Sequence, residues 1–173
     1  MAIHGAVNKD GFIQLMNENN ALIHKVCHLY GQTPMDKQDL FQEIIIQLWK
    51  AYPTFRGESK FSTWLYRIAL NTAISGYRKS KRTIATSAVD SMPVEIMDSA
   101  YDFDKEEKLK QLYWAISKLS ETEKAIVMLY LDDNSYEEME SILGINQNNL
   151  RVKMNRIKDK LRQLTKNEVY GTG

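Results

Sequence analysis

Cationic side chains are interleaved with aromatic rings between residues 50 and 82. Eight lysines and arginines stand there against a single acidic residue, Glu58, which gives the segment a net charge of +7. Aromatic residues of the same stretch include Tyr52, Phe55, Phe61, Trp64 and Tyr66. Cations neutralise phosphates and ring faces stack on unpaired bases, so this mixture is typical of a surface that binds single-stranded nucleic acid.

Helical geometry places the polar members of this segment on one face. At about 100° per residue, the side chains within about 40° of one another are Lys60, Arg67, Asn71 and Arg78. Apolar residues such as Phe61 lie to one side of that stripe. Two other interpretations stay open: a basic face can be only a solvated surface, and Phe61 and its aromatic neighbours can be ordinary core.

A second basic segment follows a helix-turn-helix pattern. Seven basic residues and one acidic residue between 144 and 166 give a net charge of +6. A short helix over 135–143 precedes Gly144-Ile145, a tight turn, and Asn146 or Gln147 opens a longer helix. The apolar seam of that helix is Leu150, Met154, Ile157, Leu161 and Leu164. The seam predicts which face is buried and leaves a polar face exposed.

The polar face of the last helix carries side chains that can read duplex DNA. Its members are Asn148, Arg151, Val152, Asn155, Arg156 and Asp159. Asn and Arg near the start of a helix in the major groove can contact adenine and guanine edges bidentately. Val152 is apolar yet predicted to point outward, toward either a thymine methyl group or a neighbouring helix.

The elements that position these residues are all predicted to be helices. Apolar residues recur at helical spacing over about 10–30, 36–51 with Asp36 as the cap, 60–81, and 109–119. A Ser120-Glu121-Thr122-Glu123 capping box then opens a helix ending near residue 131, and two helices follow over 135–143 and 147–166. No segment alternates like a strand. The fold class is therefore all-α, with two small helical domains over 1–84 and 108–173.

The segment between the two domains, residues 85–107, lacks helical periodicity. Seven acidic residues and one lysine between 90 and 107 give it a net charge of −6. A polar, acidic, proline-containing stretch between two periodic regions predicts a flexible linker.

Composition narrows the class of protein. The chain has 173 residues and a net charge of +1. That net charge by itself predicts no nucleic-acid partner. The same chain, however, contains two strongly basic segments and one acidic segment. The single cysteine, Cys27, excludes an intramolecular disulfide and multi-cysteine metal sites. No signal peptide or membrane-spanning run is recognisable. We therefore expect a cytoplasmic protein that binds free DNA weakly.

Three motifs in this order resemble a known family. Asp39-Leu40-Phe41-Gln42-Glu43, followed by Leu48-Trp49, resembles a polymerase-binding helix. Phe55-Arg56-Gly57 and the run Phe61-Ser62-Thr63-Trp64-Leu65-Tyr66-Arg67-Ile68-Ala69-Leu70-Asn71 resemble a promoter-melting segment. Residues 119–162 resemble a carboxy-terminal helix-turn-helix. The chain thus resembles the sigma factors of bacterial RNA polymerase, specifically the short, two-domain extracytoplasmic-function (ECF) group of the sigma-70 superfamily.

The resemblance implies a non-enzymatic function, promoter-specific transcription initiation, and a role for each segment. The first domain would bind core RNA polymerase, at the beta-prime coiled coil and the beta subunit, through Asp39, Gln42, Glu43, Leu48 and Trp49. The residues expected to melt and hold the minus-ten element are Phe55, Arg56, Lys60, Phe61, Trp64, Arg67, Asn71, Arg78, Lys79 and Arg82. The residues expected to read the duplex minus-thirty-five element are Asn148, Arg151, Val152, Lys153, Asn155 and Arg156.

Further expectations follow from the same resemblance. An anti-sigma factor is expected as a second protein partner, the acidic linker would run toward the RNA-exit path, and the protein would lie with polymerase at the nucleoid. No cofactor, metal or small-molecule substrate is expected. The chain departs from the family pattern at two places. It has Ser75 where many members carry Asp, and Asn148-Asn149-Leu150 in place of a common Gly-Thr-Val. The promoter sequence recognised by other members therefore cannot be assigned to this chain.

Three alternatives compete with this interpretation. His24, Cys27 and His28 lie within one helical turn, and histidines at i and i+4 can share a metal, but no acidic residue stands on that face to complete a site. A helix-turn-helix regulator could act without core polymerase, and a sigma-like domain could sequester a regulator without touching DNA. The basic faces and Asn71 count against this last alternative.

Overall fold

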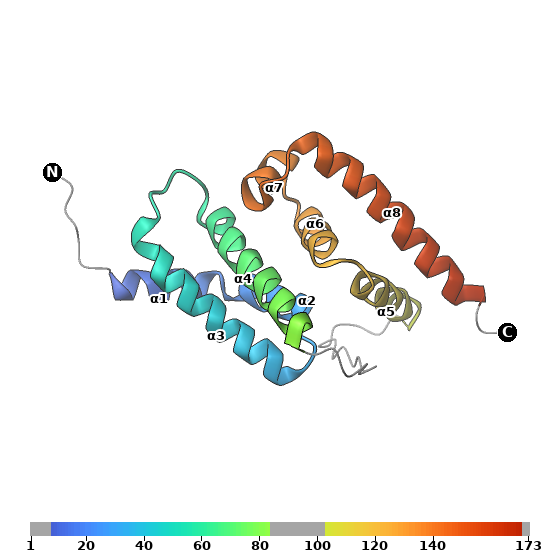
Figure 1. The fold of residues 1–173 in the computed structure, drawn as a ribbon, viewed down its shortest axis with the longest axis horizontal. Coiled ribbons are helices and arrows are strands. Elements are labelled where there is room, and N and C mark those ends of the chain that lie inside the picture. Colours follow the sequence, from blue (N-terminus) through green and yellow to red (C-terminus); the bar gives the residue numbers. More distant parts are fainter. Residues whose placement is uncertain (1–7, 84–102, 171–173) are drawn as a thin grey trace. The chain divides into compact units, whose positions relative to one another are not determined.

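The computed structural model describes residues 8–83 and 103–170, with side chains described for 8–79 and 107–166. The chain forms two compact units, coloured blue to green and yellow to red in Figure 1. The first holds α1–α4, and the second holds α5, α6, α8 and most of α7. The described residues contain helices and no strand, which confirms the all-α prediction.

The first unit begins with two short helices where the sequence predicted one. These are α1 (Lys9–Glu18) and α2 (Asn20–Tyr30). Asn19 separates them because its side-chain amide donates to the Leu15 carbonyl at 2.9 Å and its backbone N–H bonds back to the same turn. A side chain that satisfies the last carbonyls of a helix favours its end at that residue.

The next helix, α3 (Pro34–Ala51), starts two residues before the predicted start. Its N-cap is Thr33 and not Asp36: the Thr33 hydroxyl accepts from the Asp36 N–H at 3.1 Å, and the Asp36 carboxylate accepts from the Thr33 N–H at 3.2 Å. Asp36 therefore closes a capping box from inside the helix. Pro34 supports the start, since its fixed φ suits the first turn.

A turn connects α3 to the long helix α4. One 3-10 turn, η1 (Tyr52–Thr54), leads to a loop in which Gly57 has a φ of +73°, a conformation that favours glycine. Helix α4 (Phe61–Thr83) then packs on α2 and α3. The core of this unit includes fully buried Ile23, Ile44, Leu48, Leu65 and Leu70.

In the second unit, the first helix extends into the predicted linker. Helix α5 spans Phe103–Ser117, so residues 103–107 are helical, whereas residues 85–102 of the predicted linker lie outside the described part of the chain. Acidic residues are favoured in the first turn of a helix, so a run of acids does not distinguish a linker from a helix start.

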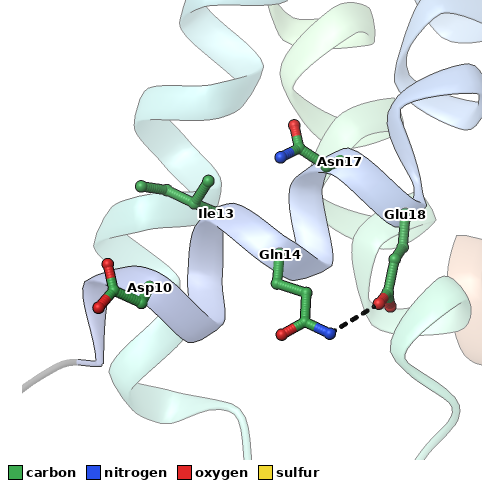
Figure 2. Close-up of a pocket in the computed structure, with 5 residues that line it drawn as sticks. All are labelled: Asp10, Ile13, Gln14, Asn17 and Glu18. Carbon is green, nitrogen blue, oxygen red and sulfur yellow. Dashed lines mark hydrogen bonds between the residues drawn. The ribbon is translucent and has the colours of Figure 1, made fainter.

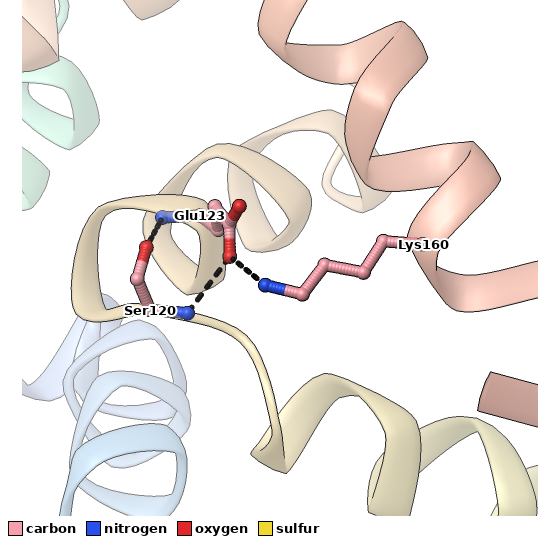
Figure 3. Close-up of polar contacts among 3 residues, drawn as sticks. All are labelled: Ser120, Glu123 and Lys160. Atoms are coloured by element: carbon pink, nitrogen blue, oxygen red, sulfur yellow. Dashed lines mark hydrogen bonds and ion pairs between the residues drawn. The ribbon is translucent and has the colours of Figure 1, made fainter. Parts of the chain in front are cut away.

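Helix α8 (Gln147–Tyr170) packs on α5 and on α6 (Glu121–Leu131). Leu150, Met154 and Ile157 of its predicted seam are buried, which confirms the assignment of that face. The Ser120–Glu123 capping box of α6 is present, and Lys160 of α8 reaches Glu123 at 3.1 Å (Figure 3). No described helix has the length and apolar character needed to cross a bilayer.

Candidate nucleic-acid interface

Three aromatic rings of the first unit meet where the turn enters α4. The ring centroid of Phe55 lies 5.4 Å from that of Phe61 and 5.1 Å from that of Trp64. Phe61 and Trp64 are 5.3 Å apart, and all three side chains are half-buried. They are therefore neither ordinary core nor free surface: each ring packs against the other two and keeps part of its area open to solvent.

The predicted basic stripe of α4 begins beside this aromatic cluster. Arg56, in the turn, is exposed, as are the stripe residues Lys60, Arg67, Asn71 and Arg78 and the neighbouring Lys79. Since Trp64 lies about 40° from Lys60 on the helix, its ring adjoins the same face. Arg82 belongs to α4, but its side chain lies outside those described. The helix thus presents cations, a carboxamide and a partly exposed aromatic ring along one side.

Two other aromatic residues are not placed as the sequence suggested. Tyr66 is only 4% exposed and belongs to the core, so it is not available to stack on a base. Tyr52 is half-buried, and its ring packs edge-on against Phe12, with ring centroids 5.3 Å apart. Its position in the sequence, three residues before Phe55, does not indicate this packing.

The helix-turn-helix forms as predicted in the second unit. Helix α7 (Tyr136–Leu143) ends at Gly144, whose φ of +70° is left-handed. Asn146 then caps α8: its side-chain oxygen accepts from the Asn149 N–H at 2.9 Å. Since the turn is fixed by a left-handed glycine and the next helix by an asparagine cap, the direction of α8 is set within three residues.

The polar face of α8 is open to solvent. Val152 is 50% exposed, which confirms that it points outward. The other predicted DNA-reading residues are also exposed: Asn148, Arg151, Lys153, Asn155 and Arg156. Their exposure leaves hydrogen-bonding groups free along the first three turns of the helix, the part that can enter a major groove.

Two contacts hold the start of α8 against α7. The Gln147 carboxamide donates to the Glu140 carboxylate at 3.1 Å, and the Arg151 guanidinium lies 4.9 Å from the centroid of the Tyr136 ring. Tyr136 could not be singled out from the sequence patterns alone. The only sequence signal was spacing: Tyr136 and Glu140 are one helical turn apart, as are Gln147 and Arg151, on either side of the Gly144 turn.

A third exposed surface lies on α3. Asp39, Gln42 and Glu43 are exposed, and Trp49 is 39% exposed while its ring contacts Phe12 at 5.0 Å. Leu48 does not belong with them: it is 0% exposed and packs in the core, because it lies on the opposite side of the helix from Asp39.

Two apolar residues that were not predicted as binding residues complete this α3 face. Ile46 is 46% exposed, and Met35 is also exposed. Ile46 follows Asp39 by seven residues, which is two helical turns, so the spacing could have identified it. The face defined by Met35, Asp39, Gln42, Glu43, Ile46 and Trp49 therefore mixes acidic and apolar groups.

The histidine pair and Cys27 line a small cavity of about 240 Å³ between α2 and α3. Burial raises the pKa of the Cys27 thiol to about 11, so the thiol is protonated at neutral pH. Burial also lowers the pKa of His28, and Lys37, 3.2 Å away, and His24 lower it further. The His24 ring stacks on Phe41 at 4.8 Å. Within the described residues, no group of three or more His, Cys, Asp or Glu is placed to hold a metal.

A larger hollow of about 550 Å³ runs along α1 (Figure 2). Its lining is Asp10, Ile13, Gln14, Asn17 and Glu18, with Gln14 donating to Glu18 at 3.0 Å. All five residues come from one helix, and the two ionisable ones, Asp10 and Glu18, are both acidic. Because its charged groups are carboxylates, this surface repels phosphate and does not suit nucleic-acid binding.

Comparison with known proteins identifies both units. Residues 15–83 match sigma-70 region 2, and residues 109–161 match sigma-70 region 4. The ECF RNA polymerase sigma-E factor of Escherichia coli K12 is 33% identical over 149 residues, which cover 79% of this chain and 78% of that protein. The ECF RNA polymerase sigma factor SigW of Bacillus subtilis is 25% identical, with 90% of this chain and 89% of the relative covered.

Solved structures share the fold. The sigma factor RpoE of Bartonella quintana, in complex with the anti-sigma factor NepR, matches with a TM-score of 0.71 at 20% identity, covering 90% of this chain and 97% of that one. CnrH, in complex with the cytosolic domain of CnrY, matches with a TM-score of 0.64 at 20% identity, covering 91% and 88%.

Two helical units, one with a basic aromatic-flanked helix and one with a helix-turn-helix, define a nucleic-acid-binding protein of the transcription machinery. The chain belongs to the sigma-70 family, in its ECF group of sigma factors. Members of this family are non-enzymatic transcription initiation factors.

Proposed function

We propose that this sigma factor binds core RNA polymerase and directs it to promoters, with the first unit holding melted minus-ten DNA and the second reading duplex minus-thirty-five DNA. The observation that carries the proposal is the exposed Lys60, Arg67, Asn71 and Arg78 face, which begins beside the half-buried cluster of Phe55, Phe61 and Trp64. A duplex-binding regulator has no need for such a surface.

In the first unit, base flipping is the step that needs protein help. Extruding a base costs a few kcal/mol, which stacking and pocket hydrogen bonds must offset. The partly open rings of Phe61 and Trp64 supply the stacking surface, and the Asn71 carboxamide supplies both a donor and an acceptor. Arg67, Arg78 and Lys79 would neutralise the phosphates on either side, with Arg82 further along α4.

The α3 face supplies the contact with polymerase. Asp39 and Glu43 are carboxylates that suit a basic partner, and Ile46 and Trp49 offer apolar area next to them. In this arrangement polymerase binds the acidic and apolar face of α3, and DNA binds the basic face of α4. The two surfaces differ in charge, because a basic face attracts phosphate whereas an acidic face repels it.

In the second unit, α8 would enter the major groove. Asn148, Arg151 and Asn155 carry the hydrogen-bonding groups that distinguish bases, while Lys153 and Arg156 suit phosphates. Val152 would contact a thymine methyl group. Since each unit covers only a few base pairs, both must act together on one polymerase, which fits a chain whose net charge is only +1.

Three further parts of the proposal follow from family membership. The protein would act in the cytoplasm, with polymerase at the nucleoid, and would carry out no catalysis of its own. An anti-sigma factor would restrain it, as RpoE of Bartonella quintana, a solved structure of similar fold at 20% identity, is bound to the anti-sigma factor NepR.

The test is reconstitution. The purified chain is mixed with core RNA polymerase, co-elution is measured by size exclusion, and run-off transcripts are measured on genomic fragments. We expect co-elution and discrete transcripts that core alone does not make. A chain that binds duplex DNA but never core would favour the helix-turn-helix regulator, and a chain that binds neither core nor DNA would favour the sequestering domain.

A further inference from the structure

We propose that Tyr136 is a positioning residue for base recognition: its ring holds the Arg151 guanidinium in the orientation that contacts the minus-thirty-five duplex. This inference rests on the proposed function, in which Arg151 reads a base. In the proposed function, only residues of α8 determine which bases are preferred; this inference adds a residue of α7.

The register of the two helices supports this role. Gln147 and Arg151 are one turn apart on α8, and Glu140 and Tyr136 are one turn apart on α7. The Gln147 carboxamide donates to the Glu140 carboxylate at 3.1 Å, and the Arg151 guanidinium lies 4.9 Å from the centroid of the Tyr136 ring. The contacts therefore pair residues of the two helices in antiparallel order. The hydrogen bond fixes the register and thereby places the guanidinium over the ring.

The backbone beneath Tyr136 is held in place. Ser135 caps α7: its hydroxyl accepts from the Glu138 N–H at 3.1 Å, and the Glu138 carboxylate accepts from the Ser135 N–H at 2.8 Å. Tyr136 is the first residue of the helix after this cap, and its side chain is half-buried. Because the cap holds the first turn of α7 in place, the Tyr136 ring offers a fixed contact surface for the long, flexible Arg151 side chain.

The chemistry of arginine allows both contacts at once. A guanidinium interacts with an aromatic ring through its charge and its flat face, whereas it binds guanine through the N–H groups at its edge. Arg151 is exposed, so its edge is accessible while the ring holds it. Ordering an arginine before it meets DNA reduces the conformational entropy lost on binding.

The experiment uses holoenzyme made from the full chain and core polymerase, with run-off transcription on a promoter library randomised in the upstream duplex element. R151A identifies the base pair that Arg151 reads, where we expect discrimination to fall about 5- to 150-fold. Y136F keeps the ring and removes the hydroxyl. Y136L removes the ring. A trifluorinated phenylalanine at position 136 keeps the ring's shape and weakens its attraction for a cation.

We expect Y136F to keep the wild-type preference. Y136L and the trifluorinated variant should each lose about 2- to 5-fold of discrimination, at the R151A base pair only, and no more when R151A is already present. The fluorinated variant keeps the test valid if Y136L does not fold, which the thermal unfolding midpoint reports.

Three outcomes would overturn the inference: unchanged preference in the fluorinated variant, loss at base pairs that R151A does not affect, or an equal loss in Y136F, which would assign the effect to the hydroxyl. If R151A itself changes no preference while transcription remains promoter-specific, the base-reading role of Arg151 is wrong. If wild-type holoenzyme starts no specific transcript, the proposed function itself fails.

Discussion

Lys160 of α8 and Glu123 of α6 form an ion pair at 3.1 Å through the same carboxylate oxygen that closes the α6 capping box (Figure 3). That oxygen also accepts from the Ser120 N–H at 2.8 Å. Burial acts to raise the pKa of Glu123, but the hydrogen bonds from Ser120 and Lys160 and the lysine charge outweigh it, so the pKa lies below its usual value. One carboxylate thus starts a helix and attaches the DNA-reading helix to it.

The first prediction concerns the pH dependence of this contact. Because the pKa of Glu123 is lowered in the folded state, its contribution is complete above the usual glutamate pKa and is lost as pH falls through the lower folded value. E123Q keeps a capping-box acceptor and removes the charge. For this partly exposed pair we expect it to lower the free energy of unfolding of the second unit by up to about 1 kcal/mol at neutral pH.

Chemical denaturation at several pH values measures this effect, with K160M as the partner variant. The difference between wild type and E123Q should shrink below pH 4.5, the unperturbed pKa of glutamate. The double variant should lose little more than either single one. A constant difference down to about pH 3 would contradict the ionic contribution.

A charge reversal tests the α3 face. Glu43 is exposed and accepts a hydrogen bond from Gln47 at 2.8 Å. We expect E43K to weaken binding to core polymerase at least about tenfold, since like charges across an interface cost several kcal/mol. Biolayer interferometry with immobilised core measures the affinity.

The chain offers a matched control for E43K. Glu18 of α1 is also exposed and accepts from a glutamine one turn away, Gln14, at 3.0 Å. E18K makes the same charge change outside the proposed face and should leave core affinity within about twofold of wild type. Equal losses in both variants would remove Glu43 from the interface.

Leu48 and Ile46 separate core packing from binding. Leu48 is fully buried, so L48A should cost about 2–5 kcal/mol of stability in the first unit. Ile46 is 46% exposed, so I46A should cost about 0.5 kcal/mol or less but weaken binding to core. Hydrogen exchange of the α3 amides measures the stability. Unchanged exchange in L48A would contradict its placement in the core.

Asn71 is expected to act on unpaired bases only. We expect N71A to weaken holoenzyme binding to a single-stranded minus-ten oligonucleotide by about 1 kcal/mol, roughly fivefold, through loss of a base hydrogen bond. S75A, one turn further along the same exposed face, is the control and should bind as wild type does. Fluorescence anisotropy gives both affinities. Similar binding by N71A and wild type would exclude Asn71 from the pocket.

Two glycines respond oppositely to alanine. Gly144 has a φ of +70°, and a Cβ there meets no atom within 4 Å, so G144A should cost about 1–2 kcal/mol through backbone strain alone. Gly76 lies within helical α4 and also has space for a Cβ, so G76A should stabilise the first unit by about 0.5–1 kcal/mol. Thermal unfolding of each variant measures the shift. A stabilised G144A would contradict the left-handed turn.

Sequence periodicity predicted the helices well where apolar spacing and caps agreed. The α8 seam at Leu150, Met154 and Ile157 is buried as predicted, and the Ser120 capping box begins α6. It failed where a local hydrogen bond decides a boundary. Asn19 divides one predicted helix into two, because its side chain hydrogen-bonds the Leu15 carbonyl in place of a continuing helix. The spacing of apolar residues gives no information about such a side-chain hydrogen bond.

Residue type was a weaker guide to the candidate sites than helix phase. Leu48 and Trp49 are adjacent and both apolar, yet one is core and the other surface. Tyr66 and Trp64 are both aromatic, yet only Trp64 remains partly open. Contacts across a turn, such as Tyr136 under Arg151, depend on the three-dimensional path of the backbone at Gly144.

The most direct test of promoter-directed initiation is to sequence the 5′ ends of transcripts made from genomic DNA by core polymerase loaded with this chain. We predict a limited set of start sites preceded by two shared sequence elements, with N71A weakening use of the downstream element and R151A relaxing one position of the upstream element. Start sites indistinguishable from those of core polymerase alone would contradict it.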